Sequence, residues 1–377
     1  MKPFKILVCI ALIAALLSGC NANSSPSRGL GDMTIVQGIG IDLDDDKTVV
    51  SLQYLDLEKG AGGADSIDGS ITTTASGTAD TIANALAASS KALSQEIFLG
   101  QNKLIVFGED YAKSGIEKGL DFLLRSIASR PDVAVAMSLD DAKEVIESKE
   151  DDARVPAENV FNLLQLGEQR GLGAVVTVND LLNLYSDKTS DIYLPVLKAE
   201  DDVVSCRGIA IFSDSQYKET LSNDACFGFL FVKDKIDGGT IVVNDSELGA
   251  IGVEILSANS HIWLSGDGDK AALNCEIKAK LMLDEIEKGI TASVDDKKVA
   301  EIEQLVNDKI EYMCTLAVNQ CFEYESDPFK LGKYAQRDNP QFYKNNKDSW
   351  RKSLKSITPK ITARSKLVRV NDNSVRS

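Results

Sequence analysis

The sequence is poor in histidine. It contains one histidine in 377 residues, His261, which lies in the stretch NSHIWLS beside apolar residues. No Ser or Cys can be given the histidine and acid partners that a catalytic triad requires. The HExxH zinc motif needs two histidines and pairs of CxxC units are absent, which argues against structural zinc. We therefore expect His261 to be a packed or surface residue in a protein without catalytic residues, metal or cofactor.

Cysteines are few and do not form an obvious disulfide pattern. Cys9 lies in an apolar N-terminal run and Cys20 closely follows that run. Five others are spread widely, and an odd number of this kind is not typical of a disulfide framework. We expect all five to be free thiols that pack as small hydrophobic side chains. A single bridge between two of them, Cys206 and Cys226, is left open; the other three are Cys275, Cys314 and Cys321.

Long apolar runs are absent apart from one at the N-terminus. Residues 6–17 read ILVCIALIAALL and follow the cations Lys2 and Lys5. Twelve apolar residues fall short of the about 20 that a membrane-spanning helix needs. A positive end, a short apolar stretch and small residues before a cleavage site describe a signal peptide, which we predict over residues 1–19.

The four residues Leu17-Ser18-Gly19-Cys20 resemble a bacterial lipobox. Cleavage before Cys20 would leave its thiol to carry a diacylglycerol through a thioether, and residues 20–31 would form a tether rich in Asn, Ser, Pro and Gly. Two or more acyl chains anchor a protein stably, at about 0.8 kcal/mol per buried CH₂. We predict lipid attachment at Cys20 and anchoring on the outer face of the cell membrane. The alternative is an ordinary secreted protein with a chance cysteine at this point.

Positive charge is scarce relative to negative charge. The formal net charge is −16, and removal of Lys2 and Lys5 with the signal peptide makes it more negative. Nucleic acids demand a positive face, so we do not expect a nucleic-acid partner. The same balance disfavours lying flat on anionic lipid head groups.

Other short motifs favour turns over binding sites. Residues 42–47, DLDDDK, would have Lys47 and Gln53 where a calcium-binding EF-hand loop needs Gly and Glu, so we expect a solvated hairpin turn. The GDGD stretch at 266–269 is read as a tight turn. Lone glycine pairs lack the third glycine of the dinucleotide fingerprint; they lie at 29–31, 38–40 and 171–173.

Hydrophobic periodicity predicts a mixed α/β or α+β protein of three consecutive domains, each a mostly antiparallel or mixed sheet with flanking helices. The N-terminal domain is predicted at 32–152. Its segment 59–78 is interpreted as a loop or a weakly specified edge strand. Its strands are predicted at 35–42, 48–57, 103–109 and 132–139, and its helices at 78–93, 109–129 and 140–148.

The middle domain is predicted at 153–248. Helices are expected at 157–169 and 177–186, and we expect Pro195 to break the chain before an acidic link at 200–202. A hairpin is expected at 206–222. The segment 225–235, ACFGFLFVKDK, could be either helix or strand.

The C-terminal domain is predicted at 249–377. Clean alternation over 272–283 predicts a half-buried strand, and an apolar stripe predicts a long helix at about 296–321. A closing strand is expected at 358–370. Trp350, Phe342 and Tyr343 could form an interaction patch, although packing of the last helix on its sheet is the preferred interpretation.

Taken in order, these segments resemble the Ger(x)C family, the C subunit of bacterial spore germinant receptors. Where the family has a Trp-Asp-Arg-rich stretch after the lipidated cysteine, this sequence has Asn21-Ala22-Asn23. The matching blocks are the lipobox at Cys20, IVQGIGID at 35–42, the run from FLGQNKLIVFGE to DVAVAM at 98–137, the VPAENVFNLL, TVNDLL and YLPVL block at 155–197, GIAIFSDSQYKETLS at 208–222 and NPQFYKNNKDSW at 339–350.

The resemblance implies a lipoprotein of three α/β domains without catalytic activity, required for spore germination. It further implies assembly with the integral membrane A and B subunits of a germinant receptor in the inner membrane of the spore. An alternative is a solute-binding lipoprotein of an ABC-type transporter, which would usually show two doubly wound lobes. A cell-wall hydrolase is a third and weaker hypothesis.

Overall fold

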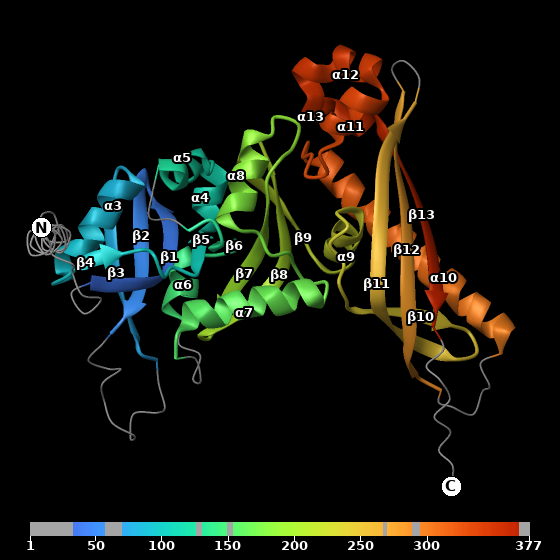
Figure 1. Cartoon of the computed structure of the whole chain (residues 1–377), viewed down its shortest axis with the longest axis horizontal. Coiled ribbons are helices and arrows are strands. Elements are labelled where there is room, and N and C mark those ends of the chain that lie inside the picture. Colours follow the sequence, from blue (N-terminus) through green and yellow to red (C-terminus); the bar gives the residue numbers. More distant parts are fainter. Residues whose placement is uncertain are drawn as a thin grey trace, which may run out of the picture.

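The structure is a computed structural model that describes residues 33–56, 70–125, 130–148, 154–266, 270–288 and 295–368. The predicted signal peptide, Cys20 and the tether lie outside these residues, as do three of the four residues at 266–269. Within the described ranges two β-sheets stand beside each other, with helices packed against both (Figure 1). The mixed α+β class predicted from the sequence is confirmed.

The first sheet contains nine of the described strands. Its centre is parallel, and an antiparallel pair extends it on each side. A short strand, β4 (Glu96–Phe98), pairs with the start of β1. The order across the sheet is β3 (Thr72–Ala79), β2 (Lys47–Leu55), β1 (Met33–Asp44), β5 (Leu104–Phe107), β6 (Ala134–Ser138), β7 (Tyr193–Glu200), β8 (Val203–Ser213) and β9 (Gln216–Leu221).

Helices cover both faces of this sheet. The side chains of β5 alternate between two apolar clusters, Leu104 and Val106 in one, Ile105 and Phe107 in the other. This burial on both faces explains why β5 is apolar at every position. One face packs against α6 (Ala142–Glu147) and α7 (Pro156–Gln169), and the other against α3 (Ile82–Ser89), α4 (Glu109–Ser114), α5 (Glu117–Arg125) and α8 (Val178–Ser186).

Two predictions in this half of the chain were wrong. The single helix predicted at 109–129 is divided into α4 and α5, because Gly115 has φ of 112° and ends α4. Pro195 does not break the chain but lies inside β7. It is tolerated because the pairing of β7 with β6 begins one residue later, at Val196, so the missing N–H of proline costs no bond to that strand. The link at 200–202 is a tight turn in which Asp201 and Asp202 adopt positive φ.

The second sheet is formed by β10 (Thr240–Asp245), β11 (Gly249–Ser265), β12 (Ala271–Ile286) and β13 (Ile357–Leu367). The first three are antiparallel, and β13 runs parallel to β12. The helix α10 (Asp296–Glu323) packs along one face of this sheet (Figure 1). Asp295 caps the start of the helix, since its carboxylate accepts the Lys298 N–H at 2.8 Å. The predicted alternating strand, long helix and closing strand are confirmed.

Side chains of α10 also cover the free edge of β13. Three residues spaced four apart on one side of the helix accept N–H groups that point away from β12. The donors and acceptors are Ala363 to Glu311 at 2.9 Å, Ser365 to Asn307 at 2.6 Å and Leu367 to Glu303 at 2.8 Å. The helix therefore satisfies part of an edge that would otherwise be open.

The sheets do not follow the predicted domain limits. The first sheet crosses residue 152, because Met137 of β6 pairs with Val196 of β7, and the second sheet begins with β10, before residue 249. The division into three domains stays a prediction. The second sheet, antiparallel except for one edge strand, is unlike the doubly wound lobe that a solute-binding lipoprotein would show.

Candidate functional site

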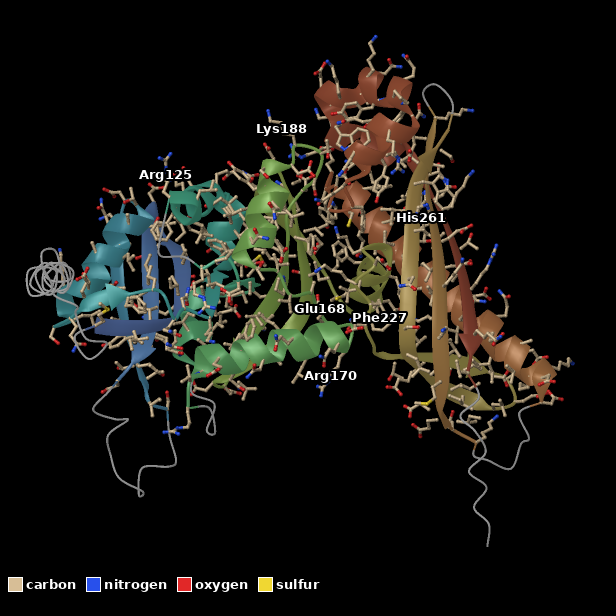
Figure 2. All side chains as sticks on the ribbon, in the orientation of Figure 1. Arg125, Glu168, Arg170, Lys188, Phe227 and His261 are labelled. Carbon is tan, nitrogen blue, oxygen red and sulfur yellow. The ribbon has the colours of Figure 1, made fainter. Side chains whose placement is uncertain are left out.

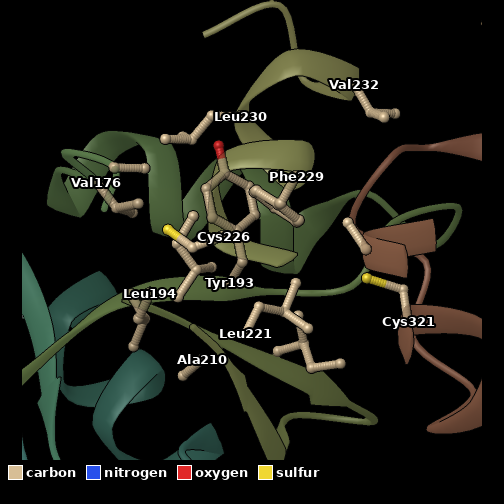
Figure 3. Packing of buried hydrophobic residues seen from close by; sticks show 14 of the residues in the cluster. Val176, Tyr193, Leu194, Ala210, Leu221, Cys226, Phe229, Leu230, Val232 and Cys321 are labelled. Atoms are coloured by element: carbon tan, nitrogen blue, oxygen red, sulfur yellow. The ribbon is translucent and has the colours of Figure 1, made fainter. Parts of the chain in front are cut away.

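The two sheets meet along α9 (Asn223–Val232), the segment whose type the sequence left open. Every residue from Ala225 to Val232 is buried, so this helix has apolar contacts on all sides. A Cβ added at Gly228 would lie 2.0 Å from the Met313 carbonyl oxygen, which shows that the backbones of α9 and α10 touch. On the opposite side, the Phe229 and Tyr193 ring centroids are 5.1 Å apart (Figure 3). A continuous apolar core thus joins the first sheet to α10.

The end of α7 is attached to α9 on the lower side of this junction. The Phe227 ring packs against Gly171, where an added Cβ would lie 1.7 Å from it. Glu168 accepts the Val175 N–H at 3.0 Å and lies 3.6 Å from the Lys235 ammonium. Figure 2 shows Glu168 and Phe227 close together where α7 meets α9.

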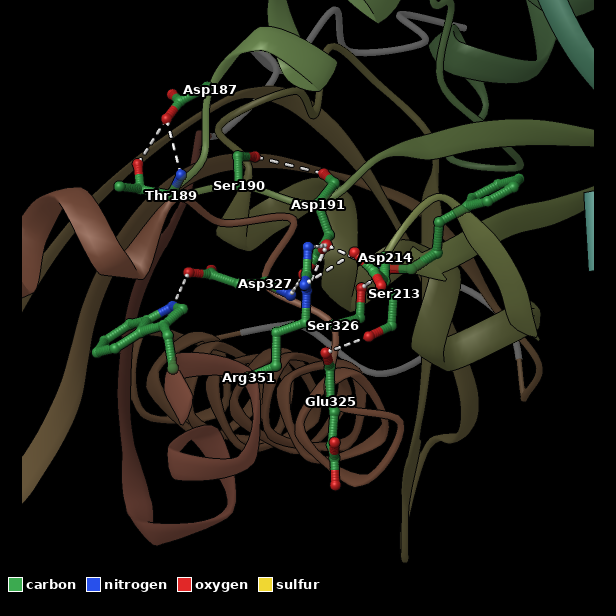
Figure 4. A network of polar contacts seen from close by, with 12 residues as sticks. Asp187, Thr189, Ser190, Asp191, Ser213, Asp214, Glu325, Ser326, Asp327 and Arg351 are labelled. Atoms are coloured by element: carbon green, nitrogen blue, oxygen red, sulfur yellow. Dashed lines mark hydrogen bonds and ion pairs between the residues drawn. The ribbon is translucent and has the colours of Figure 1, made fainter. Parts of the chain in front are cut away.

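A polar network closes the upper side of the junction (Figure 4). It is centred on residues 324–330, which join α10 to α11 (Leu331–Asp338) and which we call the junction loop. The Ser326 hydroxyl donates to the Phe212 carbonyl at 2.6 Å, and the Ser213 hydroxyl donates to the Glu325 carbonyl at 2.7 Å. The loop is therefore hydrogen-bonded directly to β8 of the first sheet.

Asp327 is the buried centre of the junction loop. Its carboxylate accepts the Leu331 N–H at 2.9 Å, the Gly332 N–H at 3.0 Å and the Trp350 indole N–H at 2.9 Å. Its side chain is 1% exposed, and burial raises the pKa of Asp327 to about 6 against the lowering effect of these bonds. The Asp327 carboxylate therefore joins the start of α11 to Trp350, which begins a later helix.

A second buried carboxylate, Asp191, links this region to the first sheet. Hydrogen bonds run both ways between the loop and this residue: the Asp191 N–H donates to the Asp327 backbone carbonyl, and the Asp327 N–H donates to the Asp191 carboxylate, both at 2.8 Å. Arg351 lies 2.9 Å from the Asp191 carboxylate and 3.2 Å from Asp214. Burial raises the pKa of Asp191, and the charge of Arg351 opposes that rise. Asp191 is buried whereas the Arg351 side chain is 39% exposed, so loss of Arg351 would leave a buried carboxylate without its charged partner.

The aromatic residues near the C-terminus serve packing. Phe342 is 1% exposed and Trp350 is 9% exposed, and their ring centroids are 6.1 Å apart. Tyr343 lies 5.6 Å from the Trp350 ring. The burial of Phe342 and Trp350 confirms that they pack, and their neighbours are one another, Tyr343 and Gly332 of α11. The two buried rings leave little surface for an interaction patch. The residues belong to α12 (Pro340–Asn346) and α13 (Trp350–Ser353).

The acidic stretch at 42–47 is a hairpin turn, as expected, because Asp44 pairs with Lys47 across it. Its first carboxylate has a structural task. Asp42 is 5% exposed and accepts the Ala142 N–H at 2.6 Å and the Lys143 N–H at 3.0 Å, so it caps α6 from a neighbouring strand. Burial raises the pKa of Asp42 to about 6, more than the two bonds lower it.

This raised pKa predicts a pH effect on stability. A carboxyl that binds its proton more tightly in the folded state loses its stabilising contribution as pH rises from the unfolded pKa of about 4 to the folded pKa of about 6. We expect the free energy of unfolding of the wild type to fall, relative to that of Asp42→Asn, between pH 4.5 and pH 7. Urea denaturation of both proteins at the two pH values measures this difference. A change of opposite sign would mean that the two N–H bonds outweigh burial.

The thiols and the single histidine do not form a reactive centre. All the cysteines in the described ranges are free, so the bridge between Cys206 and Cys226 is not formed. Burial raises the pKa of Cys206 to about 11, which suppresses its thiolate. His261 is exposed and stacks on Trp263 with centroids 5.4 Å apart. Among the described residues there is no group of three His, Cys, Asp or Glu that could hold a metal ion.

A cavity of about 440 Å³ lies between α11, β11 and the end of α9. Its cations are mostly bonded to the protein itself, so we do not interpret it as an assembled anion site. The four cations that line it are Lys233, Lys330, Lys333 and Arg337. Three have protein partners: Lys233 donates to the Pro328 carbonyl at 2.9 Å, Lys330 pairs with Asp187 and Arg337 pairs with Asp338.

The junction residues escaped the sequence analysis. Asp327 and Asp191 are 136 positions apart, and Arg351 is 160 positions from Asp191. None of the three belongs to a motif that a sequence would reveal: Asp191 directly precedes an apolar run, Asp327 lies between Ser326 and Pro328, and Arg351 lies between Trp350 and Lys352. Their partnership follows only from the folded arrangement.

Comparison with known proteins gives consistent matches along most of the chain. A family model described as "Spore germination protein N-terminal domain" matches residues 27–199, and one described as "Spore germination B3/GerAC like, C-terminal" matches residues 207–371. The spore germination protein GerQC of Bacillus cereus is 22% identical over 359 residues, which cover 93% of this chain and 95% of that protein.

A solved structure shares the fold. The crystal structure of the GerBC protein aligns with a TM-score of 0.59 at 16% identity, over 88% of this chain and 97% of that chain. None of the helices that the structure describes is both long and apolar enough to span a bilayer.

Proposed function

The chain belongs to the Ger(x)C family of spore germination proteins, and from this premise we propose that it is a non-catalytic lipoprotein subunit of a nutrient germinant receptor. The observation that carries the proposal is the pair of family matches, which together run from residue 27 to residue 371 with a short gap. A role in spore germination follows from membership. The receptor assembly and the anchoring are the parts that we propose.

The junction supports a role in assembly and signal coupling. A continuous apolar core, a buried carboxylate and the ion pair between Asp191 and Arg351 hold the two sheets against each other. Such an arrangement resists bending between the halves, so a force applied to one sheet is transmitted to the other. This suits a subunit that holds integral membrane A and B subunits together and couples their responses.

We place the protein on the outer face of the membrane through a lipid on Cys20. The proposal rests on the sequence Leu17-Ser18-Gly19-Cys20 after a short apolar run. A tether of this kind confines the protein to two dimensions and raises its effective concentration at membrane-embedded partners. Affinity for those partners can then be modest.

Cys20→Ala is expected to release the protein from the membrane. Without a thioether there are no acyl chains to hold the chain in the bilayer. A gene-deletion strain that carries Cys20→Ala should show the protein in the soluble fraction, no incorporation of labelled palmitate, and a loss of germination with nutrients. Fractionation, labelling and a germination assay measure the three effects.

Cys206→Ala is the matched control, since it removes a thiol that lies within the folded part of the chain. It should keep membrane attachment, palmitate labelling and germination. Firm membrane binding of Cys20→Ala would disprove the anchor while leaving the receptor role intact. Normal nutrient germination of the deletion strain itself would disprove the receptor role.

A further inference from the structure

The outward face of the second sheet is strongly cationic. The apolar side chains of β12, such as Cys275 and Ile277, point toward α9 and α10, so the alternate residues point away from both helices. Five of the outward residues on β12 and β13 are exposed cations. They are Lys278 and Lys280 on β12, and Lys360, Arg364 and Lys366 on β13.

The strand register brings these cations together. Lys278 is the partner of Arg364 and Lys280 is the partner of Lys366 in the parallel ladder. Strands in a sheet lie about 4.8 Å apart, and alternate residues along a strand lie about 7 Å apart. Lys278, Lys280, Arg364 and Lys366 therefore form one compact group, and Lys360 lies four residues from Arg364 along β13 on the same face. We call the five together the cationic face.

The charge of this face is only partly balanced by acids of the protein. Within residues 274–280 and 358–366 there is one acidic residue, Glu276, and on β11 Glu254, the partner of Met282, faces the same way. In the described part of the chain none of the five cations has an ion pair, although surface pairs are common elsewhere on the molecule. Like charges in adjacent strands repel one another. A sheet that keeps them together unpaired is suited to an anionic surface outside the chain.

The neighbouring strand adds an aromatic pair. His261 is the β11 partner of Glu276 and Trp263 is the β11 partner of Asn274, so both residues belong to the outward face. Their stacked rings stand beside the cations rather than in the core. Tryptophan is enriched at the headgroup level of membranes, and clusters of four to eight Lys and Arg are typical of anionic-lipid binding.

We propose that the cationic face lies against the anionic headgroups of the lipid bilayer. The face is the surface of a sheet, and its chemistry is mainly charge with an aromatic margin. The acidic remainder of the chain is repelled by the same lipids, so contact through this face directs most of the molecule away from the bilayer. The net charge of −16 does not reveal this separation of positive and negative charge, because it is a sum over the whole chain.

The lipid contact is independent of the anchor. It rests on the proposed function only for bringing the protein to a membrane, and an unlipidated chain can test it. We would use the chain from residue 20 with Cys20→Ser, which keeps every residue that the structure describes. The probe is a vesicle of phosphatidylcholine with about 30% phosphatidylglycerol, compared with pure phosphatidylcholine.

The decisive variant neutralises four exposed cations, Lys278→Gln, Lys280→Gln, Arg364→Gln and Lys366→Gln. Co-sedimentation at about 50 mM salt should show binding of the unmodified chain to the anionic vesicles alone, with weaker binding in high salt. The variant should lose about tenfold or more of its partition into those vesicles. Its thermal unfolding should match that of the parent, since all four side chains are exposed.

A matched control removes the same charge elsewhere on the surface. Lys47→Gln, Lys91→Gln, Lys118→Gln and Lys344→Gln lie on other elements and are also exposed. This control should retain the binding of the parent. An equal loss in both variants, or no binding of the parent to anionic vesicles, would overturn the proposal. If the parent chain does not bind vesicles but the variant of the cationic face abolishes germination, the partner of this face is an acidic protein surface and the lipid proposal is wrong.

Discussion

Replacing Asp327 with alanine is expected to lower the free energy of unfolding by about 4 kcal/mol. The change leaves three buried donors without an acceptor, namely the N–H groups of Leu331, Gly332 and the Trp350 indole. Each unsatisfied buried donor costs about 1–3 kcal/mol, and relief of the buried charge offsets part of the sum. Urea denaturation followed by tryptophan fluorescence measures the loss, and Trp350 should become more exposed.

Asp348→Ala is the control for this prediction. Asp348 lies two residues before Trp350 but is exposed, so its removal should leave the unfolding midpoint unchanged. If Asp327→Ala costs less than about 1 kcal/mol, the three donors have found other partners, and the junction loop is not held by this carboxylate. In a germination assay, Asp327→Ala should also reduce the nutrient response, because the two sheets would no longer move together.

Gly228→Ala is expected to destabilise the contact between α9 and α10 strongly. The added methyl group would lie 2.0 Å from the Met313 carbonyl oxygen and 2.2 Å from its carbon. Both atoms belong to the backbone of α10 and cannot rotate away, so α9 and α10 would have to separate. Overpacking of this kind costs about 3 kcal/mol. Thermal and urea unfolding would show the loss.

Gly173→Ala is the matched change. The nearest atoms to its added methyl group are the Gly208 carbonyl oxygen at 3.6 Å and the Pro195 side chain at 4.0 Å, which are ordinary contacts. Its unfolding midpoint should stay close to that of the wild type. Equal stability of Gly228→Ala and the wild type would show that the two helices are farther apart than the structure places them.

Local patterns predicted most of the individual elements. The β8–β9 hairpin was predictable because the sequence Ser213-Asp214-Ser215 directly follows an apolar run, and Asp214 and Ser215 both have positive φ. The long helix α10 was predictable because its apolar stripe repeats over many turns. By contrast, α9 is apolar all around, and a fully buried segment has no polar face whose period could identify it.

Sheet membership could not be predicted from the same patterns. The pairing of β6 with β7 joins residues about 60 positions apart, and no local feature of Met137 or Val196 specifies the partner. The contacts of the junction between the two sheets likewise join residues that are distant in the sequence. Asp191, Asp327 and Arg351 acquire their roles because three distant segments meet at one point, so a single sequence without its fold offers no signal for them.

The helix side chains along β13 have a consequence for how other molecules can approach. Glu303, Asn307 and Glu311 already occupy N–H groups that a foreign extended peptide would need. Lengthening of the sheet by a guest chain, or edge-to-edge pairing of neighbouring copies, is blocked on this side. Any strand that joins this sheet would therefore have to pair with β10, the strand at its other edge.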